Sequence, residues 1–326
     1  MVSVIIPAYN AEHTIGNCLQ SLMEQDWPGE FEVIVVDDGS ADSTSQIVDG
    51  FTGVRLVRQS NAGPAAARNR GAAEAKGDII LFTDADCVPE INWMSEMVRP
   101  FKEHPEAVGV KGRYKTRQKK ITARFVQLEY EDKYRYMLND QYIDFIDTYS
   151  AGFRKDVFLG MNGYDTEFPV ACAEDVELSF RMANKGYKMI FNHDAVVYHT
   201  HPERIAAYLR KKYKFAFWRI VAVKKNPNKI MKDSHTPKTM KVQLLFPPAL
   251  FISLLWDVLN RSYSFTLLLL FLFLCTTLPF ALRAIKTDTA AGLLSPAFLL
   301  LRSIAQFFGV SGGMLHLFTK RRGSCN

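Results

Sequence analysis

The sequence contains few cysteines, and they are widely spaced. Five cysteines occur in 326 residues, and no two of them have the CxxC spacing. Structural zinc sites usually use cysteine pairs at that spacing, and disulfide scaffolds are short chains with a higher share of cysteine. We therefore expect neither a zinc site nor a disulfide framework, and the cysteine content suits a reducing compartment.

A glycine-rich phosphate-binding loop is also missing. Neither GxGxxG nor GxxxxGK[ST] occurs anywhere in the chain. Such loops bring backbone N–H groups to the phosphates of dinucleotides and nucleoside triphosphates. The sequence therefore excludes a dinucleotide-binding fingerprint and a P-loop NTPase, and a bound diphosphate must be neutralised by other groups.

The chain also lacks the features of a nucleic-acid-binding protein and of a secretory leader. The net charge is only +6, and no nucleic-acid-binding motif is present. A strand-like segment, VSVIIP, begins at Val2, where a signal peptide would carry its charged and apolar regions. We expect no nucleic-acid partner and no signal peptide.

Short β-branched segments alternate with helical segments over the first part of the chain. The expected strands are residues 2–7, 32–37, 54–58 and 78–84, and the expected helices are residues 11–25, 43–50 and 64–76. This alternation is typical of a mostly parallel central sheet with helices on both faces. The sequence thus predicts an α/β fold.

Polar residues directly follow three of these strands. PAYN (7–10) follows the first, DDGS (37–40) the second and DAD (84–86) the fourth. Ligands of open parallel sheets bind beyond the carboxyl ends of the strands. Asp84 and Asp86 offer hard oxygen ligands for a divalent cation that would hold a diphosphate. The alternative is that these two residues only form a turn before the next helix.

Six motifs together resemble the inverting family 2 glycosyltransferases. They are PAYN (7–10), VVDDGSADST (35–44), NAGPAAARNRG (61–71), FTDADC (82–87), NGYDTEF (162–168) and AEDVELSFRMANKGYKM (173–189). The motifs come in the order of that family and cover residues 2 to 200. The resemblance implies a GT-A fold, which is Rossmann-like, and a nucleotide-activated sugar as donor.

The resemblance also implies which residues bind the donor. They would line the pocket, accept hydrogen bonds from the base or ribose, or reach the nucleotide from a helix: Pro7, Ala8, Tyr9, Glu12, Asp37, Asp38, Arg68, Asp84 and Ala85. Each has a structural alternative. Asp37 and Asp38 can form a turn with Gly39, and Arg68 can pair with Glu74 on its own helix.

A metal site is implied in the same way. Asp84 and Asp86 match the DxD pair of the family, with Asp86 as a direct ligand, and His199 matches a histidine that completes the metal sphere in related enzymes. The ion would be Mn²⁺ or Mg²⁺, because both suit an oxygen-rich site. His201 would face the same side of an extended segment as His199. The alternative is that both histidines are solvated.

The acidic pair Glu174 and Asp175 matches the catalytic position of the family, with Asp175 as the base. A helix N-terminus lowers the pKa of a carboxyl group, so we expect Asp175 to be ionised at neutral pH and to orient the acceptor hydroxyl. The alternative is that both acids only favour the helix dipole in the first turn.

We expect three parts along the chain. Residues 1–200 would be the GT-A domain, with a nucleotide-sugar-binding half (1–112) and an acceptor and catalytic half (113–200). Residues 201–241 would form amphipathic basic helices at a membrane interface, because the segment 204–225 mixes Lys and Arg with aromatic residues.

Residues 242–326 would be embedded in the membrane. They hold three apolar blocks, 242–259, 265–282 and 292–318. Basic residues lie before the first block and after the second and third, and the positive-inside rule would place all of them in the cytoplasm. We expect two spans plus a re-entrant or surface segment, in the cell membrane, with the catalytic domain in the cytoplasm.

These features predict a metal-dependent enzyme that moves one sugar from a nucleoside-diphosphate sugar, expected to be a UDP-sugar, to a membrane-associated acceptor such as a polyprenyl-linked glycan. Membrane lipids would be further partners. A processive polysaccharide synthase is one alternative, although QxxRW, which such synthases usually carry, is absent. A catalytically inactive scaffold is another, and the presence of Asp84, Asp86 and Asp175 argues against it.

Overall fold

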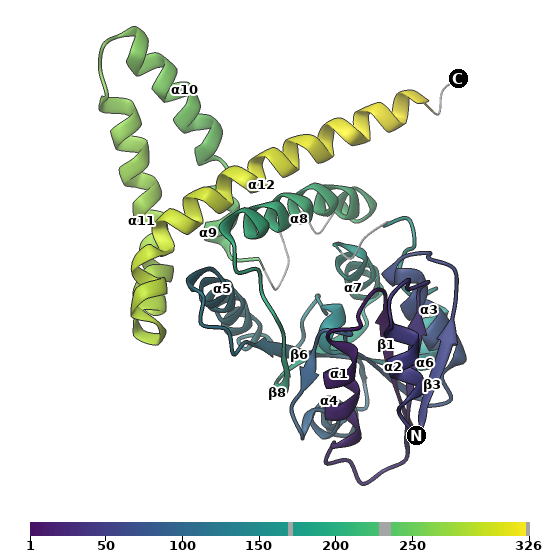
Figure 1. The fold of residues 1–326 in the computed structure, drawn as a ribbon. Coiled ribbons are helices and arrows are strands. Elements are labelled where there is room, and N and C mark those ends of the chain that lie inside the picture. The colour runs from purple at the N-terminus through teal and green to yellow at the C-terminus, as the bar shows by residue number, and fades with distance from the viewer. Residues whose placement is uncertain (169–171, 228–235, 324–326) are drawn as a thin grey trace. The chain divides into compact units, whose positions relative to one another are not determined.

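The computed structural model describes residues 1–168, 172–227 and 236–323, and the chain forms two compact units. The first unit comprises residues 1–117, 137–200 and 225–235, and the second comprises residues 118–136, 201–224 and 236–326. Figure 1 shows both units and labels many of their helices and strands.

An eight-stranded sheet forms the centre of the first unit, with the strand order β3-β2-β1-β4-β7-β6-β8-β5. The strands are β1 (Val2–Ala8), β2 (Phe31–Asp37), β3 (Val54–Arg58), β4 (Ile79–Phe82), β5 (Val88–Pro89), β6 (Ala107–Lys115), β7 (Ala151–Arg154) and β8 (Lys188–Tyr198). The first four strands pair in parallel, while β7 pairs antiparallel with both β4 and β6. The mostly parallel α/β fold predicted from the sequence is confirmed.

Helices α1 (Ile15–Met23), α2 (Thr44–Asp49), α3 (Pro64–Glu74), α4 (Trp93–Glu103), α6 (Lys155–Gly160) and α7 (Glu174–Asn184) belong to the same unit. Helix α3 packs closely on β1 and β2. A Cβ atom added at Gly71 would overlap Ile5 and lie 3.2 Å from Val36. Glycine at this position therefore lets the helix approach the sheet.

The second unit consists of helices α5 (Ile121–Met137), α8 (Ile205–Lys225), α9 (Lys238–Gln243), α10 (Phe246–Leu259), α11 (Ser264–Thr287) and α12 (Thr289–Gly323). Its core is aromatic. The ring of Phe125 on α5 stacks on Phe298 of α12 at 4.5 Å and meets Tyr208 of α8 edge to face. Phe273 of α11 belongs to the same buried cluster.

The division of the chain differs from the predicted one. We expected residues 113–200 to form one continuous half of the GT-A domain, but residues 118–136 belong to the second unit. The reason is the packing of α5, whose apolar side chains contribute Phe125, Val126 and Leu128 to the core that α11 and α12 share. A sequence pattern shows that such a helix has an apolar face but not which partner covers it.

The three apolar blocks are helical. Three candidate membrane spans are long and apolar enough to cross a bilayer, namely Lys238–Leu259, Ser264–Thr287 and Thr289–Thr319. Many of their large apolar side chains are exposed, among them Trp256, Phe271 and Leu315. Length and composition therefore fit association with a membrane.

A buried charged network lies among the helices of the second unit. Arg302 of α12 donates hydrogen bonds to Glu129 at 2.8 Å and to Gln243 at 2.6 Å. Lys212 also pairs with Glu129, at 2.9 Å. Burial would raise the pKa of Glu129, but the charges of Lys212 and Arg302 outweigh it and lower that pKa to about 2. The Glu129 carboxylate is therefore fully ionised inside the unit.

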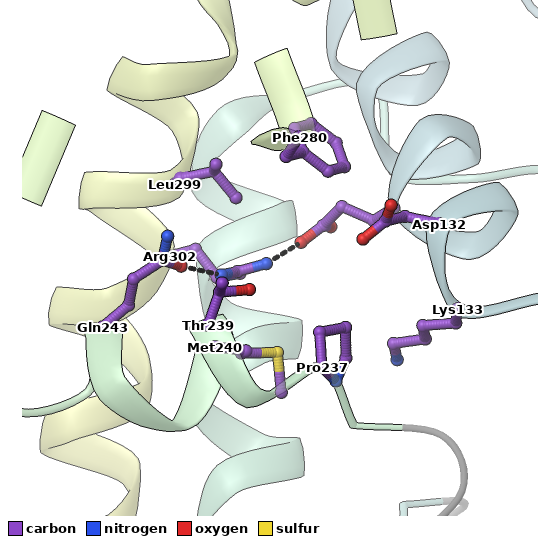
Figure 2. Close-up of a pocket in the computed structure, with 10 residues that line it drawn as sticks. Asp132, Lys133, Pro237, Thr239, Met240, Gln243, Phe280, Leu299 and Arg302 are labelled. Atoms are coloured by element: carbon purple, nitrogen blue, oxygen red, sulfur yellow. Dashed lines mark hydrogen bonds and ion pairs between the residues drawn. The ribbon is translucent and has the colours of Figure 1, made fainter. Parts of the chain in front are cut away.

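The network borders a very small cavity. Figure 2 shows Arg302 and Gln243 on its wall, together with Met240 and Pro237. Its volume is about 20 Å³, which is enough for a single water molecule.

Candidate active site

A cavity of about 690 Å³ opens in the first unit at the carboxyl ends of the central strands. Eight of the predicted site residues line it: Pro7, Ala8, Tyr9, Asp38, Arg68, Asp84, Ala85 and Asp86. The rest of the lining comes from these motifs or from the residues just after PAYN, and was not among the predicted site residues: Asn10, Ala11, Thr14, Asn61, Gly63, Pro64 and Ala67. The volume lies in the range typical of small-molecule and cofactor sites.

Arg68 on α3 connects two motifs that are far apart in the sequence. Its side chain is 2% exposed and donates to Asp84 at 2.7 Å and to Glu174 at 3.1 Å. Burial would lower the pKa of Arg68, but the two carboxylates outweigh it and raise that pKa. Among the described residues, Nε of Arg68 has no hydrogen-bond partner. The arginine is therefore a fixed positive charge in the cavity wall that retains a free donor.

Asn69, the next residue on α3, holds the NGYDTEF segment. Its side chain donates to the carbonyl oxygen of Tyr164 at 2.7 Å and accepts from the N–H of Tyr164 at 2.8 Å. Asn162 and Gly163 have φ values of +59° and +60°, and a Cβ atom at Gly163 would lie 2.9 Å from Cγ of Asn69. The segment is thus held in one conformation beside α3.

Asp86, Cys87 and His199 form the one candidate metal cluster found among the described residues. Their ligand atoms all lie within 4.8 Å of one another, and Nδ1 of His199 is 3.5 Å from a carboxylate oxygen of Asp86. Asp86 is exposed at 44% of its side chain, whereas Cys87 is buried. Burial and then the charges of Asp84 and Asp86 raise the pKa of the Cys87 thiol, which keeps it protonated.

The carboxylate oxygens of Asp86 fit Mn²⁺ or Mg²⁺. Asp84 lies outside the cluster, because Arg68 holds its Oδ1 atom. The structure also separates the two histidines. His199 stacks on Tyr114 of the first unit with a ring distance of 4.6 Å, whereas His201 belongs to the second unit and bonds to Gln127 at 3.0 Å.

Asp38 organises the loop before α3. Its carboxylate accepts hydrogen bonds at 2.8 Å from the side chain of Gln59 and from the N–H groups of Ala62 and Gly63. Asp38 also lines the cavity. Its contact with a nucleotide remains a prediction.

Glu12 and Asp37 are not among the residues that line the described cavity, and their predicted contacts with a nucleotide stay predictions. Glu12 accepts from the N–H of Ser43 at 3.0 Å, and Asp37 accepts from the N–H of Ser40 at 2.9 Å and from the Ser45 hydroxyl. Burial would raise the pKa of Asp37, but the hydrogen bonds from Ser40 and Ser45 hold it below its ordinary value. Both carboxylates therefore support the loop of residues 40–45.

Glu174 at the start of α7 uses both of its carboxylate oxygens within the protein. Oε1 accepts from Arg68, and Oε2 accepts from the N–H groups of Cys172 at 2.8 Å and Ala173 at 3.1 Å. It is 2% exposed. These contacts fix the first turn of α7 and, with it, the neighbouring Asp175.

The expected low pKa of Asp175 is wrong in direction. Burial raises the pKa of this half-buried carboxyl well above its ordinary value, and the charges of Glu174 and Asp147 raise it further. The N–H of Val176 donates to Asp175 at 2.7 Å, but this bond lowers the pKa by less. Desolvation and the nearby negative charges thus raise the pKa of Asp175 by more than the helix N-terminus lowers it.

A buried ion pair near Asp175 had no signal in the sequence. Lys111 of β6 is completely buried, pairs with Asp147 and donates to the hydroxyl of Tyr149 at 3.0 Å. Burial lowers the pKa of Lys111, and the charge of Asp147 opposes that shift. A lysine within an alternating strand is normally assigned to the solvent face, so only the observed pairing reveals it.

Comparisons with known proteins agree with this geometry. Residues 3–160 match the model of the family described as glycosyl transferase family 2. The chain is 30% identical over 231 residues to the probable glycosyltransferase YdaM of Bacillus subtilis (strain 168), which covers 66% of this chain and 54% of YdaM. It is 23% identical over 281 residues to a poly-beta-1,6-N-acetyl-D-glucosamine synthase of Staphylococcus epidermidis, covering 80% of this chain and 67% of that protein. The chain thus spans about half the length of YdaM.

Two solved structures share the fold. The mannosyltransferase PcManGT from Pyrobaculum calidifontis, in complex with GDP-Man and Mn²⁺, superposes with a TM-score of 0.62 at 20% identity, covering 96% of this chain and 86% of that chain. Residues 1–349 of S. aureus TarS superpose with a TM-score of 0.51 at 20% identity, covering 97% and 91% of the two chains. Residues 3–160 therefore form a glycosyl transferase family 2 domain, and the chain has a GT-A fold.

Proposed function

We propose that this chain is an inverting glycosyltransferase that moves one sugar from a nucleoside-diphosphate sugar to a hydroxyl of a membrane-associated acceptor. The observation that carries the proposal is the cavity of about 690 Å³ with Arg68, Asp84 and Asp86 in its wall. A cavity of that volume accommodates a ligand of nucleotide size. Membership of the family supplies the class of reaction.

A divalent cation is part of the proposal. Asp86 and His199 of the cluster would hold it, with Asp84, whose Oδ1 atom is bound to Arg68, as a further proposed ligand, and PcManGT, which shares the fold, was solved with GDP-Man and Mn²⁺. When bound, Mn²⁺ or Mg²⁺ neutralises the diphosphate and stabilises the charge that develops on it. Arg68 contributes a second positive charge from the cavity wall, close to Asp84.

Asp175 is the proposed base. It accepts the proton of the acceptor hydroxyl while that oxygen bonds to the anomeric carbon and the bond from this carbon to the diphosphate oxygen breaks. Attack from the opposite face inverts the configuration without a protein nucleophile. The raised pKa of Asp175 makes it a stronger base than a solvated aspartate. Glu174 acts as a positioning residue, because its oxygens are already bonded within the protein.

The acceptor is proposed to lie at the membrane. The three apolar helices of the second unit support this location, and a polyprenyl-linked glycan is the expected class of acceptor. The basic residues that flank the apolar blocks, such as Lys238 and Arg283, support a catalytic unit in the cytoplasm.

A processive polysaccharide synthase is the second candidate. It is favoured by the similarity to the poly-beta-1,6-N-acetyl-D-glucosamine synthase, which extends over 80% of this chain. The absence of QxxRW favours transfer of a single sugar instead. Product length on a defined lipid-linked acceptor separates the two.

The test combines binding and turnover. Thermal shift with UDP, GDP and other nucleoside diphosphates, with and without Mn²⁺, is expected to show stabilisation by one base that requires the cation. Slow hydrolysis of the matching nucleotide sugar is expected to be lost in Asp175→Asn and retained in Asp156→Asn, an exposed aspartate at the start of α6. Full activity of Asp175→Asn would remove the assignment of the base, and the absence of any nucleotide effect would remove the proposed donor.

A further inference from the structure

The third apolar helix, α12, lies against α8 through a row of glycines. A Cβ atom at Gly309 would lie 2.9 Å from Cβ of Ala216, and one at Gly313 would lie 2.6 Å from the carbonyl oxygen of Phe217. Only glycine allows the two backbones to approach this closely. The GVSGG segment of α12 is therefore a helix-packing surface toward α8.

The contact continues over most of the length of α8. At one end, Tyr208 meets Phe298 with a ring distance of 6.2 Å. At the other end, Trp218 meets His316 at 6.1 Å. The two helices thus run side by side from Phe298 to His316 of α12, as Figure 1 also shows.

The composition of α8 is unfavourable for the hydrocarbon core of a bilayer. Its sequence, IAAYLRKKYKFAFWRIVAVKK, has no acidic residue and is rich in Lys and Arg. Arg210 and Lys214 are exposed, and Tyr213 and Trp218 lie between the basic residues. Cationic side chains are costly at the centre of a bilayer, whereas a basic helix with aromatic residues is typical of the headgroup layer.

The depth of α8 limits the depth of α12. If α12 crossed the bilayer, its neighbour α8 would be carried into the hydrocarbon with its basic side chains. Arg302, near the middle of the candidate span, is already bonded to Glu129 and Gln243, so charge lies beside this part of α12 as well. The opposite face of α12 is apolar and exposed, with Phe308 at 59%, Leu315 at 65% and Phe318 at 67%.

We propose that α8 and the second half of α12 form an interfacial platform that binds anionic lipid headgroups, and that α12 is not a membrane crossing. Phe308, Leu315 and Phe318 enter the upper acyl region, while Arg210 and Lys214 contact headgroup phosphates. Helices α10 and α11 then make the only deep insertion among the described helices. This inference does not depend on the proposed sugar transfer.

Depth-dependent quenching tests the position of α12. A fluorophore is attached to Leu315→Cys on α12 or to Phe271→Cys on α11 in the full chain, with Cys172, Cys275 and Cys325 replaced by alanine. The two sites are matched, because Leu315 is 65% exposed and Phe271 is 62% exposed. In vesicles of phosphatidylcholine and phosphatidylglycerol, we expect Leu315 to be quenched more by shallow spin-labelled lipids, and Phe271 more by deep ones. Equal deep quenching at Phe308→Cys, Leu315→Cys and Phe271→Cys would overturn the platform.

Amide hydrogen exchange tests the lipid partner. In nanodiscs, phosphatidylglycerol is expected to slow exchange in α8 severalfold relative to phosphatidylcholine alone. The variant Arg210→Gln with Lys214→Gln should lose this difference. The control Lys76→Gln with Lys185→Gln removes the same charge from exposed sites of the first unit and should keep it. Exchange in α8 that is equal in both lipids would overturn the assignment of an anionic partner.

Discussion

Among the residues whose burial the structure describes, each unit buries one arginine, and the two arginines have different roles. Arg68 is 2% exposed and pairs with Asp84 and Glu174, and Arg302 is 6% exposed and pairs with Glu129. In both, the Nε atom lacks a partner among the described residues. The space beside them differs. Arg68 faces a cavity of about 690 Å³ and Arg302 one of about 20 Å³.

The comparison shows that a buried charge indicates a ligand site only where there is room for a ligand. Both arginines satisfy the same electrostatic requirement, since a buried cation needs carboxylates close by. Lys212 and Gln243 complete the network of Arg302, which borders a space for one water molecule. The network of Arg68 borders a cavity large enough for a ligand. We therefore assign a functional role to Arg68 and a packing role to Arg302.

The largest effect is expected from Arg68→Met. The variant leaves Asp84 and Glu174 without their cation, which costs about 3–5 kcal/mol of stability. Donor hydrolysis should fall by about 100-fold or more, because a preorganised charge is lost from the site. Unfolding by denaturant and single-turnover hydrolysis measure the two effects. Near-normal hydrolysis by the folded variant would show that Arg68 is only structural.

A smaller effect is expected from Arg302→Met. Glu129 keeps its bonds to Lys212 and Tyr208, so the cost should be about 1–3 kcal/mol. Hydrolysis by the folded protein should not change. A loss of hydrolysis equal to that of Arg68→Met would end the contrast between the two arginines.

Glycine packing gives the next test. Gly309→Ala places a methyl group against Tyr213 and Ala216, and we expect a loss of about 1–3 kcal/mol. Gly160→Ala is the control, because a Cβ atom there meets nothing within 4 Å. Thermal unfolding in detergent compares the two variants. Equal stability of both would show that α8 and α12 are not tightly packed.

The smallest effect concerns pH and Asp175. The folded pKa of Asp175 is raised above that of the unfolded chain, so the native state binds its proton more tightly, and stability falls as pH rises through the folded pKa. Asp175→Asn should therefore raise Tm by a few degrees at neutral pH. The gain should vanish below pH about 4, the pKa of a free aspartate, where the carboxyl is protonated in both states. A gain that is independent of pH would contradict the raised pKa.

Much of the catalytic unit could be predicted from its motifs. PAYN, the DxD pair and NAGPAAARNRG all reach the cavity, because alternating strands and helices force the carboxyl ends of parallel strands to one edge. The sequence could not predict which individual carboxylates form hydrogen bonds and ion pairs within the protein. Glu12 and Asp37 support a loop, and the lysine of β6 is buried with Asp147, since these outcomes depend on partners distant in the sequence.

The helical unit was less predictable for a related reason. An apolar helix in the sequence is compatible with lipid, with a soluble core or with another helix. The packing of α5 against α11 and α12 could not be read from the sequence, because these helices follow more than a hundred residues later. The sequence shows the glycines of α12, but it does not show that they pack against α8.

By itself, the sequence determined the α/β fold, the resemblance to a family and the set of residues at the strand ends, because local periodicity and motif order are properties of neighbouring residues. Only the tertiary structure decided which charges are paired, that Asp175 has a raised pKa, and that α12 lies along α8. These features arise from desolvation and from contacts between distant segments, and both exist only once the chain is folded.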